Sequence, residues 1–192
     1  MGTSILQKNL DKSGFFNSHH IATYSSVFPP TTVAATTSIL SGKTPNEHCW
    51  LGWDCYYPQI NKNVTVFANK ETGTDEPAAD YNVAQKYFYY QTIATKIKEK
   101  GFKAYEVTPF VSPFPDSFSK ICEEIDRHCQ EPGKKYVYAY WTEPDHIMHS
   151  DGCYSEMAKK VLLDLEEKVR LLCDKIENGL IVHNSNHISV YR

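Results

Sequence analysis

Two short stretches of the chain combine residue types that suit phosphoryl-transfer chemistry. The first, residues 26–53, reads SVFPPTTVAATTSILSGKTPNEHCWLGW and places two threonines directly after Phe-Pro-Pro. A threonine hydroxyl at the start of a helix can act as a nucleophile, because the backbone N–H groups and the helix dipole there favour phosphate oxygens and a developing alkoxide. The second, residues 140–152, reads YWTEPDHIMHSDG and places Asp145 four residues before His149. A carboxylate and an imidazole at this spacing suit a divalent metal ion, so the two stretches together indicate metal-assisted phosphoryl chemistry.

Thr31 and Thr32 are the candidate nucleophiles. Both follow Pro30, which prevents a helix from starting earlier, and they lead into a helix expected over residues 32–41 that Gly42 ends. A threonine at this position also commonly serves as a helix N-cap, a structural role that requires no chemistry. The sequence leaves both roles open for the two residues.

Asp145 and His149 are the candidate metal ligands, and zinc accepts both donor types. Pro144 disfavours helix before Asp145, so the carboxylate is expected in a loop with His149 on the following turn. The alternative is that Asp145 caps a helix and His149 is an ordinary surface residue. Glu143 is a candidate for a residue that hydrogen-bonds to a metal ligand and orients it.

Three other histidines bear on the site. His183 and His187 follow the last expected strand, where either one could complete a metal site or be incidental. His48, within PNEHCW, is interpreted as structural.

Strands and helices alternate along the chain and must position these residues. Strands are expected at 15–26, 103–108, 135–140 and 180–182, and helices at 32–41, 85–100, 116–130 and 155–176. This alternation predicts the α/β class, with a mainly parallel sheet flanked by helices in one domain over residues 1–192. Ligands of such sheets bind beyond the carboxyl ends of the strands, where both Thr32 and Asp145 are expected.

A long surface excursion is expected at about residues 56–83, which are rich in Asn, Thr, Pro, Asp and Gly. Long ordered loops in compact domains often border functional sites. Trp53, Tyr56 and Tyr57 could either stack against a leaving group or anchor this excursion.

The composition narrows the class of protein. A net charge of −3 without a basic block gives no reason to expect binding to a nucleic-acid polymer. No apolar run approaches the roughly 20 residues that a membrane span needs. The six cysteines form no Cys-x-x-Cys pair, which is typical of reduced thiols and predicts a cytoplasmic protein.

The two stretches together resemble the type I phosphodiesterase/nucleotide pyrophosphatase branch of the alkaline phosphatase superfamily, and in particular its bacterial alkaline-phosphatase-like proteins. The resemblance extends over nearly the whole chain. It implies an alkaline-phosphatase-like fold with a two-metal centre, usually zinc. It also implies hydrolysis of a small phosphate ester through a covalent phospho-threonine intermediate. Thr32 matches the family's nucleophile, Asp145 and His149 match two metal ligands, and His187 matches a third.

The chain departs from the family pattern at three points. No aspartate precedes Asp11, so the family's first strand, which ends in an aspartate ligand, is expected to be missing. Residues 183–187 read HNSNH and lack the family's Asp-His-Gly run, and Ala35 stands where nucleotide pyrophosphatases have asparagine. Two hypotheses follow. The chain is a metal-dependent phosphoric-ester hydrolase, or it is a catalytically impaired fragment that binds phosphate or one metal ion without turnover.

Overall fold

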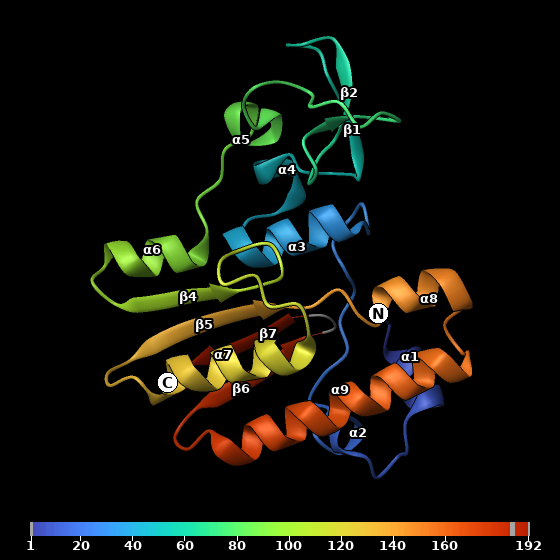
Figure 1. Cartoon of the computed structure of the whole chain (residues 1–192), viewed down its shortest axis with the longest axis vertical. Coiled ribbons are helices and arrows are strands. Elements are labelled where there is room, and N and C mark those ends of the chain that lie inside the picture. The colour runs from blue at the N-terminus through green and yellow to red at the C-terminus, as the bar shows by residue number, and fades with distance from the viewer. Residues whose placement is uncertain (1, 185–186, 192) are drawn as a thin grey trace. The chain divides into compact units, whose positions relative to one another are not determined.

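A computed structural model describes residues 2–184 and 187–191, and the chain divides into two compact units (Figure 1). Unit 1 comprises residues 1–23 and 97–192, and unit 2 comprises residues 24–96. The chain leaves unit 1 after residue 23 and returns to it at residue 97, so unit 2 is an insertion in the chain of unit 1. The sequence predicted one domain over residues 1–192, and the excursion predicted at 56–83 lies entirely within unit 2.

The described part of unit 1 contains a four-stranded sheet in the order β4-β5-β7-β6. Its strands are β4 (Lys103–Val107), β5 (Lys135–Tyr140), β6 (Leu180–Asn184) and β7 (His187–Tyr191). β4 and β5 are parallel, whereas β7 is antiparallel to both β5 and β6. The α/β class is therefore confirmed, but the prediction of a mainly parallel sheet is wrong. The link from β6 to β7 is too short for the crossover that a parallel pair requires, so these strands form a hairpin.

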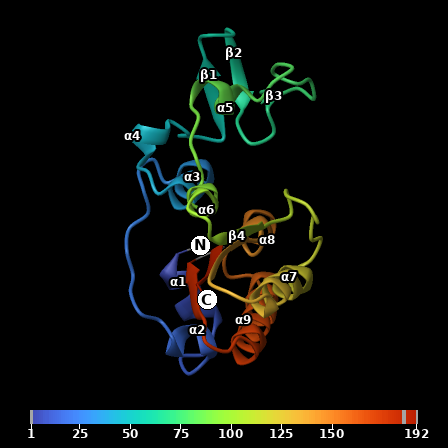
Figure 2. The same ribbon diagram turned by 90° about the vertical axis from the view of Figure 1, so that its left-hand side faces the viewer.

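Two long helices, α7 (Phe118–Gln130) and α9 (Glu156–Lys175), pack on one side of this sheet (Figure 2). Each begins at a serine whose hydroxyl accepts a backbone N–H: Ser117 caps α7 and Ser155 caps α9. Apolar side chains of the helices and the strands form one buried core, which includes Ile121, Ile125, Val137, Leu165, Val169, Leu172 and Val190. The predicted helices at 116–130 and 155–176 and the strand at 135–140 are thus confirmed.

The strand predicted at residues 15–26 is wrong. Short helices α1 (Thr3–Asn9) and α2 (Phe15–Ser18) occupy this part of the chain, and residues 20–27 form no regular element. The carboxylate of Glu166 in α9 accepts the backbone N–H of Phe16, and the rings of Phe15 and Phe16 pack against the core. Tertiary packing therefore overrides the local strand preference of these aromatic residues. Thr32 consequently does not follow a strand.

Unit 2 begins with α3 (Thr32–Ser41) and α4 (Pro45–His48). Gly42 adopts the left-handed conformation, with φ of 69°, and ends α3 as the sequence predicts. The antiparallel strands β1 (Asp54–Tyr57), β2 (Lys62–Thr65) and β3 (Lys70–Glu71) follow, and all but the start of β1 lies within the predicted excursion. Tyr57 is only 1% exposed and anchors this sheet in the core of unit 2.

The helix predicted at residues 85–100 is interrupted. It consists of α5 (Val83–Tyr87) and α6 (Ile93–Glu99), which spans the boundary between the units. The backbone carbonyl of Phe88 accepts the indole N–H of Trp50 at 2.9 Å instead of a helical N–H. A side chain distant in sequence thus takes the acceptor that a continuous helix would have used.

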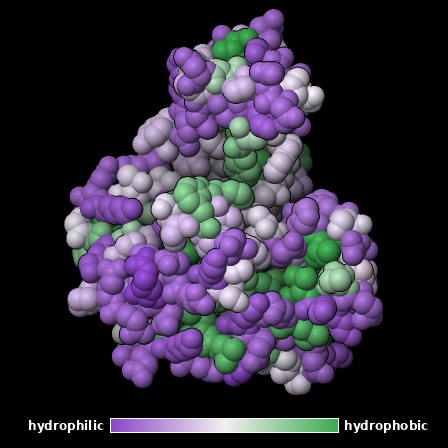
Figure 3. Space-filling view, in the orientation of Figure 1, coloured by the Kyte–Doolittle hydropathy of each residue, from purple (hydrophilic) through white to green (hydrophobic). Residues whose placement is uncertain are grey.

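The outer surface of α9 carries isolated apolar side chains, among them Met157, Leu163 and Leu171. Figure 3 shows apolar and polar atoms interspersed over this helix, which is ordinary for a protein surface. In the described part of the chain, no helix combines the length and the apolar character needed to cross a bilayer.

Candidate active site

Thr31, rather than Thr32, is the N-cap of α3. Its hydroxyl oxygen accepts the backbone N–H of Ala34 at 3.1 Å, which satisfies one of the helix donors that lack an acceptor in the preceding turn. The same hydroxyl donates to the carbonyl of Leu51 at 2.7 Å and so ties the first turn of α3 to the segment that leads into β1. Both hydrogen-bonding capacities of Thr31 are therefore committed to structure.

Thr32 occupies the first helical position, and its side chain is exposed. Its hydroxyl makes no hydrogen bond to any described residue. The backbone N–H groups of Thr32 and Val33 also lack an acceptor there, while the Val33 side chain is fully buried and fixes the turn in the core. A free hydroxyl thus lies at a helix N-terminus with two available N–H donors, an arrangement suited to a phosphate oxygen.

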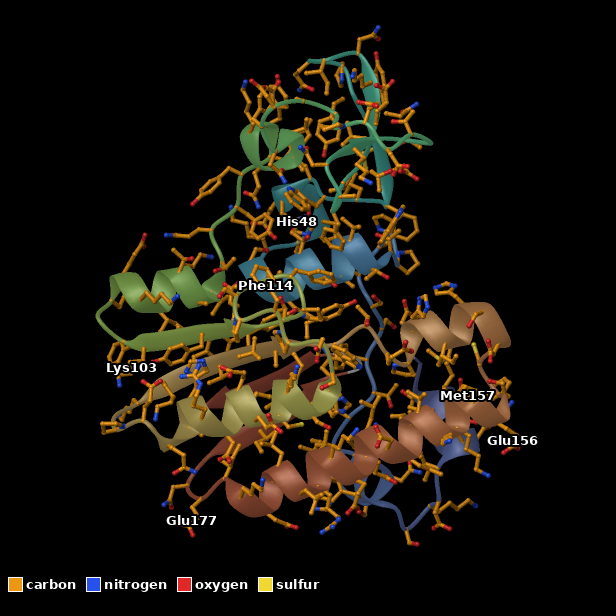
Figure 4. The ribbon with its side chains drawn as sticks, viewed as in Figure 1. His48, Lys103, Phe114, Glu156, Met157 and Glu177 are labelled. Carbon is orange, nitrogen blue, oxygen red and sulfur yellow. The ribbon has the colours of Figure 1, made fainter. Side chains whose placement is uncertain are left out.

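His48 supports α3 from the side of α4 and is only 1% exposed (Figure 4). Its Nδ1 accepts the backbone N–H of Trp50 at 3.0 Å, so its Nε2 carries the proton and donates to the Ser38 hydroxyl at 3.0 Å. Burial lowers the pKa of the His48 imidazole below its ordinary value. These contacts agree with the structural role predicted for His48.

The candidate metal ligands lie on α8 (Asp145–Asp151), which follows the carboxyl end of β5 as predicted. Asp145 is the first residue of the helix rather than part of a loop, and His149 lies one turn later on the same face. Their Oδ2 and Nε2 atoms are 3.7 Å apart, and the His149 side chain is 81% exposed. The Glu143 carboxylate accepts the backbone N–H of Ile147 at 3.0 Å and so caps α8. Within the described structure, it makes no hydrogen bond to Asp145 or His149.

The late histidines differ in position. The ring of His183 stacks on Phe16, with centroids 4.7 Å apart, which commits one of its faces to packing. His187 pairs with Tyr140 in the register of β5 and β7, and this places its backbone at the end of β5 that leads to Asp145. Its side chain lies outside the described residues.

The predicted site therefore draws its nucleophile from unit 2 and its metal ligands from unit 1. Asp145 and His149 are brought together as a pair, with a carboxylate oxygen and an imidazole nitrogen that both suit zinc. Among the described side chains, no group of three His, Cys, Asp or Glu residues could hold a metal ion. The donor types of Asp145 and His149 fit zinc, and the pair would supply two of the four ligands that zinc usually takes.

A second polar cluster had no signal in the sequence. The Glu131 carboxylate accepts hydrogen bonds from the Tyr105 hydroxyl at 2.6 Å, from His128 Nδ1 at 3.0 Å and from Lys103 Nζ at 3.0 Å. The Tyr105 bond, followed by the other two, lowers the pKa of Glu131 to about 2. These residues lie at the amino end of the sheet, opposite the end that leads to Asp145, so the cluster links α7 to β4 and takes no part in the predicted site.

A pocket of about 500 Å³ opens near the same amino end of the sheet. Its lining combines lysines with apolar side chains: Ile97, Phe102, Lys103, Lys134, Lys135, Tyr136, Asn178 and Leu180. None of the predicted site residues lines it.

Comparison with known proteins supports the chemistry that these local arrangements suit. The chain matches the family described as Type I phosphodiesterase / nucleotide pyrophosphatase over residues 15–188, which is nearly its whole length. The match includes α3 with Thr32, α8 with Asp145 and His149, and the start of β7. No curated protein matched the chain. The chain therefore belongs to the type I phosphodiesterase/nucleotide pyrophosphatase family of the alkaline phosphatase superfamily, and it is a phosphodiesterase- or pyrophosphatase-like hydrolase.

Proposed function

We propose that this protein hydrolyses a small phosphate ester with Thr32 as its nucleophile, in an alkaline-phosphatase-like domain that depends on a divalent metal ion. The observation that carries the proposal is the division of labour between the two threonines. Thr31 caps α3, and the Thr32 hydroxyl beside it is exposed and has no hydrogen-bond partner among the described residues. Family membership supplies the class of reaction.

The first turn of α3 would bind the phosphoryl group. The N–H groups of Thr32 and Val33 can donate to its oxygens, and the positive end of the helix dipole stabilises their negative charge. Such donors also stabilise the charge that develops on the oxygens as the reaction proceeds. Thr31 positions both N–H groups through its cap and its bond to Leu51.

The reaction takes place in two displacements. The Thr32 oxygen forms a bond to phosphorus while the bond from phosphorus to the alcohol breaks, and the alcohol leaves after accepting a proton. Water then attacks phosphorus, breaks its bond to the threonine oxygen and releases phosphate or a phosphate monoester. Thr32 regains its proton in this second step. The overall reaction breaks one ester bond and consumes one water molecule.

Asp145, His149 and His187 are the residues that would hold the metal, which we propose to be zinc. When bound, zinc supplies Lewis acidity, which polarises a phosphoryl oxygen and lowers the pKa of water. The pair on α8 offers one oxygen and one nitrogen ligand on the same helical face. Glu143 would orient these ligands indirectly, because it caps the helix that carries them.

The decisive experiment measures the hydrolysis of bis(p-nitrophenyl) phosphate by the zinc-loaded protein. Thr32→Ala is expected to reduce kcat/KM at least about 1,000-fold without changing thermal stability. Thr74→Ala, which alters an exposed threonine of the β3 region in the same unit, is the matched control and should retain full activity. Turnover that survives in Thr32→Ala would refute the proposed nucleophile.

The alternative is a fragment that binds phosphate or one metal ion without turnover. It is favoured by the absence of a three-ligand group among the described residues. Zinc stoichiometry separates the two functions. Two zinc ions per chain with Thr32-dependent turnover support the hydrolase, whereas one zinc ion with no turnover supports the non-catalytic fragment.

A further inference from the structure

Three tight turns lie at the amino ends of β4, β5 and β6 (Figure 1). They follow α6, α7 and α9, and each contains one residue in the left-handed conformation: Gly101 with φ of 81°, Gly133 with φ of 91° and Asn178 with φ of 56°. Residues of this kind let the chain reverse direction within a few positions. The pocket of about 500 Å³ opens beside these turns, and its lining draws on all three.

The pocket faces away from α7 and α9. Side chains alternate between the two faces of a sheet along each strand, and Val137 and Ile181 pack in the core with α7 and α9. The residues directly before them, Tyr136 and Leu180, therefore lie on the opposite face, and both line the pocket. Lys134, two residues before Tyr136, continues the same alternation. Segments distant in sequence thus contribute to one surface.

The floor of the pocket is apolar. Tyr136 is only 6% exposed, so its neighbours hold it in place, whereas Phe102 is 55% and Leu180 is 59% exposed. Exposed apolar surface that is rimmed by polar side chains is typical of a binding site. The volume also falls within the range of about 300–1,000 Å³ that is usual for small-molecule sites. The size and the floor therefore suit a small organic molecule with an apolar part.

The three lysines of the lining differ in what their ammonium groups contact. Lys103 forms an ion pair with the Glu131 carboxylate at 3.0 Å, and Lys135 donates to the backbone carbonyls of Cys129 and Glu131. Lys134 is exposed, and its ammonium group makes no hydrogen bond or ion pair with any described residue. The described lining contains no aspartate or glutamate. One uncompensated positive charge therefore borders the apolar floor.

We propose that this pocket binds a small amphipathic anion, with its negative head group at Lys134 and its apolar tail along Phe102 and Leu180. A single free ammonium group matches a singly charged head group such as a carboxylate. None of the residues of the proposed hydrolase site lines the pocket. The inference therefore goes beyond the proposed function and does not rest on it.

The test follows the binding of octanoate, below its micelle concentration, by assigned NMR spectra of the whole chain. Amide shifts should cluster at residues 101–103, 133–136 and 178–181. Lys134→Glu should weaken octanoate binding about 5- to 10-fold, because it replaces an attraction by a repulsion, and should leave the binding of uncharged 1-octanol unchanged. Lys134→Arg should retain the affinity for octanoate. Lys160→Glu, which reverses an exposed lysine of α9, is the matched control.

A second variant tests the tail. Leu180→Ser should weaken octanoate and 1-octanol alike, whereas Leu171→Ser, which changes an exposed leucine of α9, should weaken neither.

Three outcomes would overturn the site: shifts spread over other parts of the chain, octanoate binding that survives in Lys134→Glu, or the same shifts on raising the protein concentration without octanoate, which would indicate a second copy in the pocket. Thr32→Ala should leave octanoate binding unchanged, so this proposal and the proposed function can fail independently.

Discussion

The helix starts at α3 and α8 carry the two halves of the predicted site, and they are built differently. At α3, the Thr31 cap and the Leu51 carbonyl hold the first turn, and the buried His48 bonds Ser38 further along the helix. At α8, Asp145 and His149 lie 3.7 Å apart, and neither side chain makes a hydrogen bond or ion pair with any other described residue. The nucleophile half is thus fixed by tertiary contacts, whereas the metal half is a local product of helical spacing.

The largest difference in stability between the two halves should appear when one histidine is replaced in each. We expect His48→Ala to reduce the free energy of unfolding by about 2–4 kcal/mol, because it leaves a cavity and a buried Trp50 N–H without an acceptor. His146→Ala on α8 removes an exposed imidazole and should cost less than about 0.5 kcal/mol. Urea denaturation measures both, and equal losses would show that α3 is not held as described.

Removing the residues that cap α3 and α8 should give a smaller difference in stability. Thr31→Ala is expected to cost about 1 kcal/mol, because it removes the acceptor for Ala34 N–H and the bond to Leu51. Thr31→Ser keeps the hydroxyl and should recover most of this stability. Glu143→Ala, which uncaps the short α8, should cost no more than about 0.5 kcal/mol. Thermal melts at neutral pH provide the measurement, and a larger loss from Glu143→Ala would reverse the comparison.

Acid should destabilise the two units in a defined order. The folded-state pKa of His48 lies below the ordinary value of 6.5, so the unfolded chain binds the proton first and unit 2 loses stability as pH falls below about 6.5. The pKa of Glu131 is lowered from 4.5 to about 2, so its contribution to unit 1 is complete above about pH 4.5 and is lost only as pH falls toward 2.

Hydrogen exchange, corrected for the intrinsic effect of pH, can follow this order segment by segment. Amides of α3 should lose protection at a higher pH than amides at the end of α7 beside Glu131. The variant Glu131→Gln should remove the low-pH transition of α7 and leave that of α3 in place. Earlier loss of protection in α7 would contradict the assignment.

The smallest effect on stability is expected when Asp145 or His149 is replaced in the zinc-free protein. Asp145→Ala and His149→Ala should each change the stability of the zinc-free protein by less than about 0.5 kcal/mol, since their pair is exposed. In the wild-type protein, added zinc should raise the melting temperature, because it binds the folded state. Both variants should lose this rise, and Asp151→Ala at the other end of α8 should keep it. A zinc-induced rise that persists in Asp145→Ala would remove that residue from the metal site.

Local sequence signals predicted the elements that depend on neighbouring residues. The helix over Thr32–Ser41 and its end at Gly42 follow from the preceding prolines and from the left-handed glycine. Local signals also predicted the strand Lys135–Tyr140 and the helices α7 and α9, each of which begins after a serine. The four-residue spacing of Asp145 and His149 predicted that they act as a pair, although Asp145 was expected in a loop; helical periodicity is what brings them together.

The sequence by itself thus determined the family, the α/β class and two chemically suited stretches, since these depend on residue type and short-range spacing. Only the tertiary structure decided that residues 15–26 do not form a strand, since Glu166 and the core of unit 1 compete for Phe15 and Phe16. It alone decided that the Thr31 hydroxyl is fully engaged while the Thr32 hydroxyl has no partner among the described residues, because the second bond of Thr31 is to Leu51, 20 residues away. Contacts between residues so far apart depend on how the chain packs, and packing leaves no pattern in the local sequence.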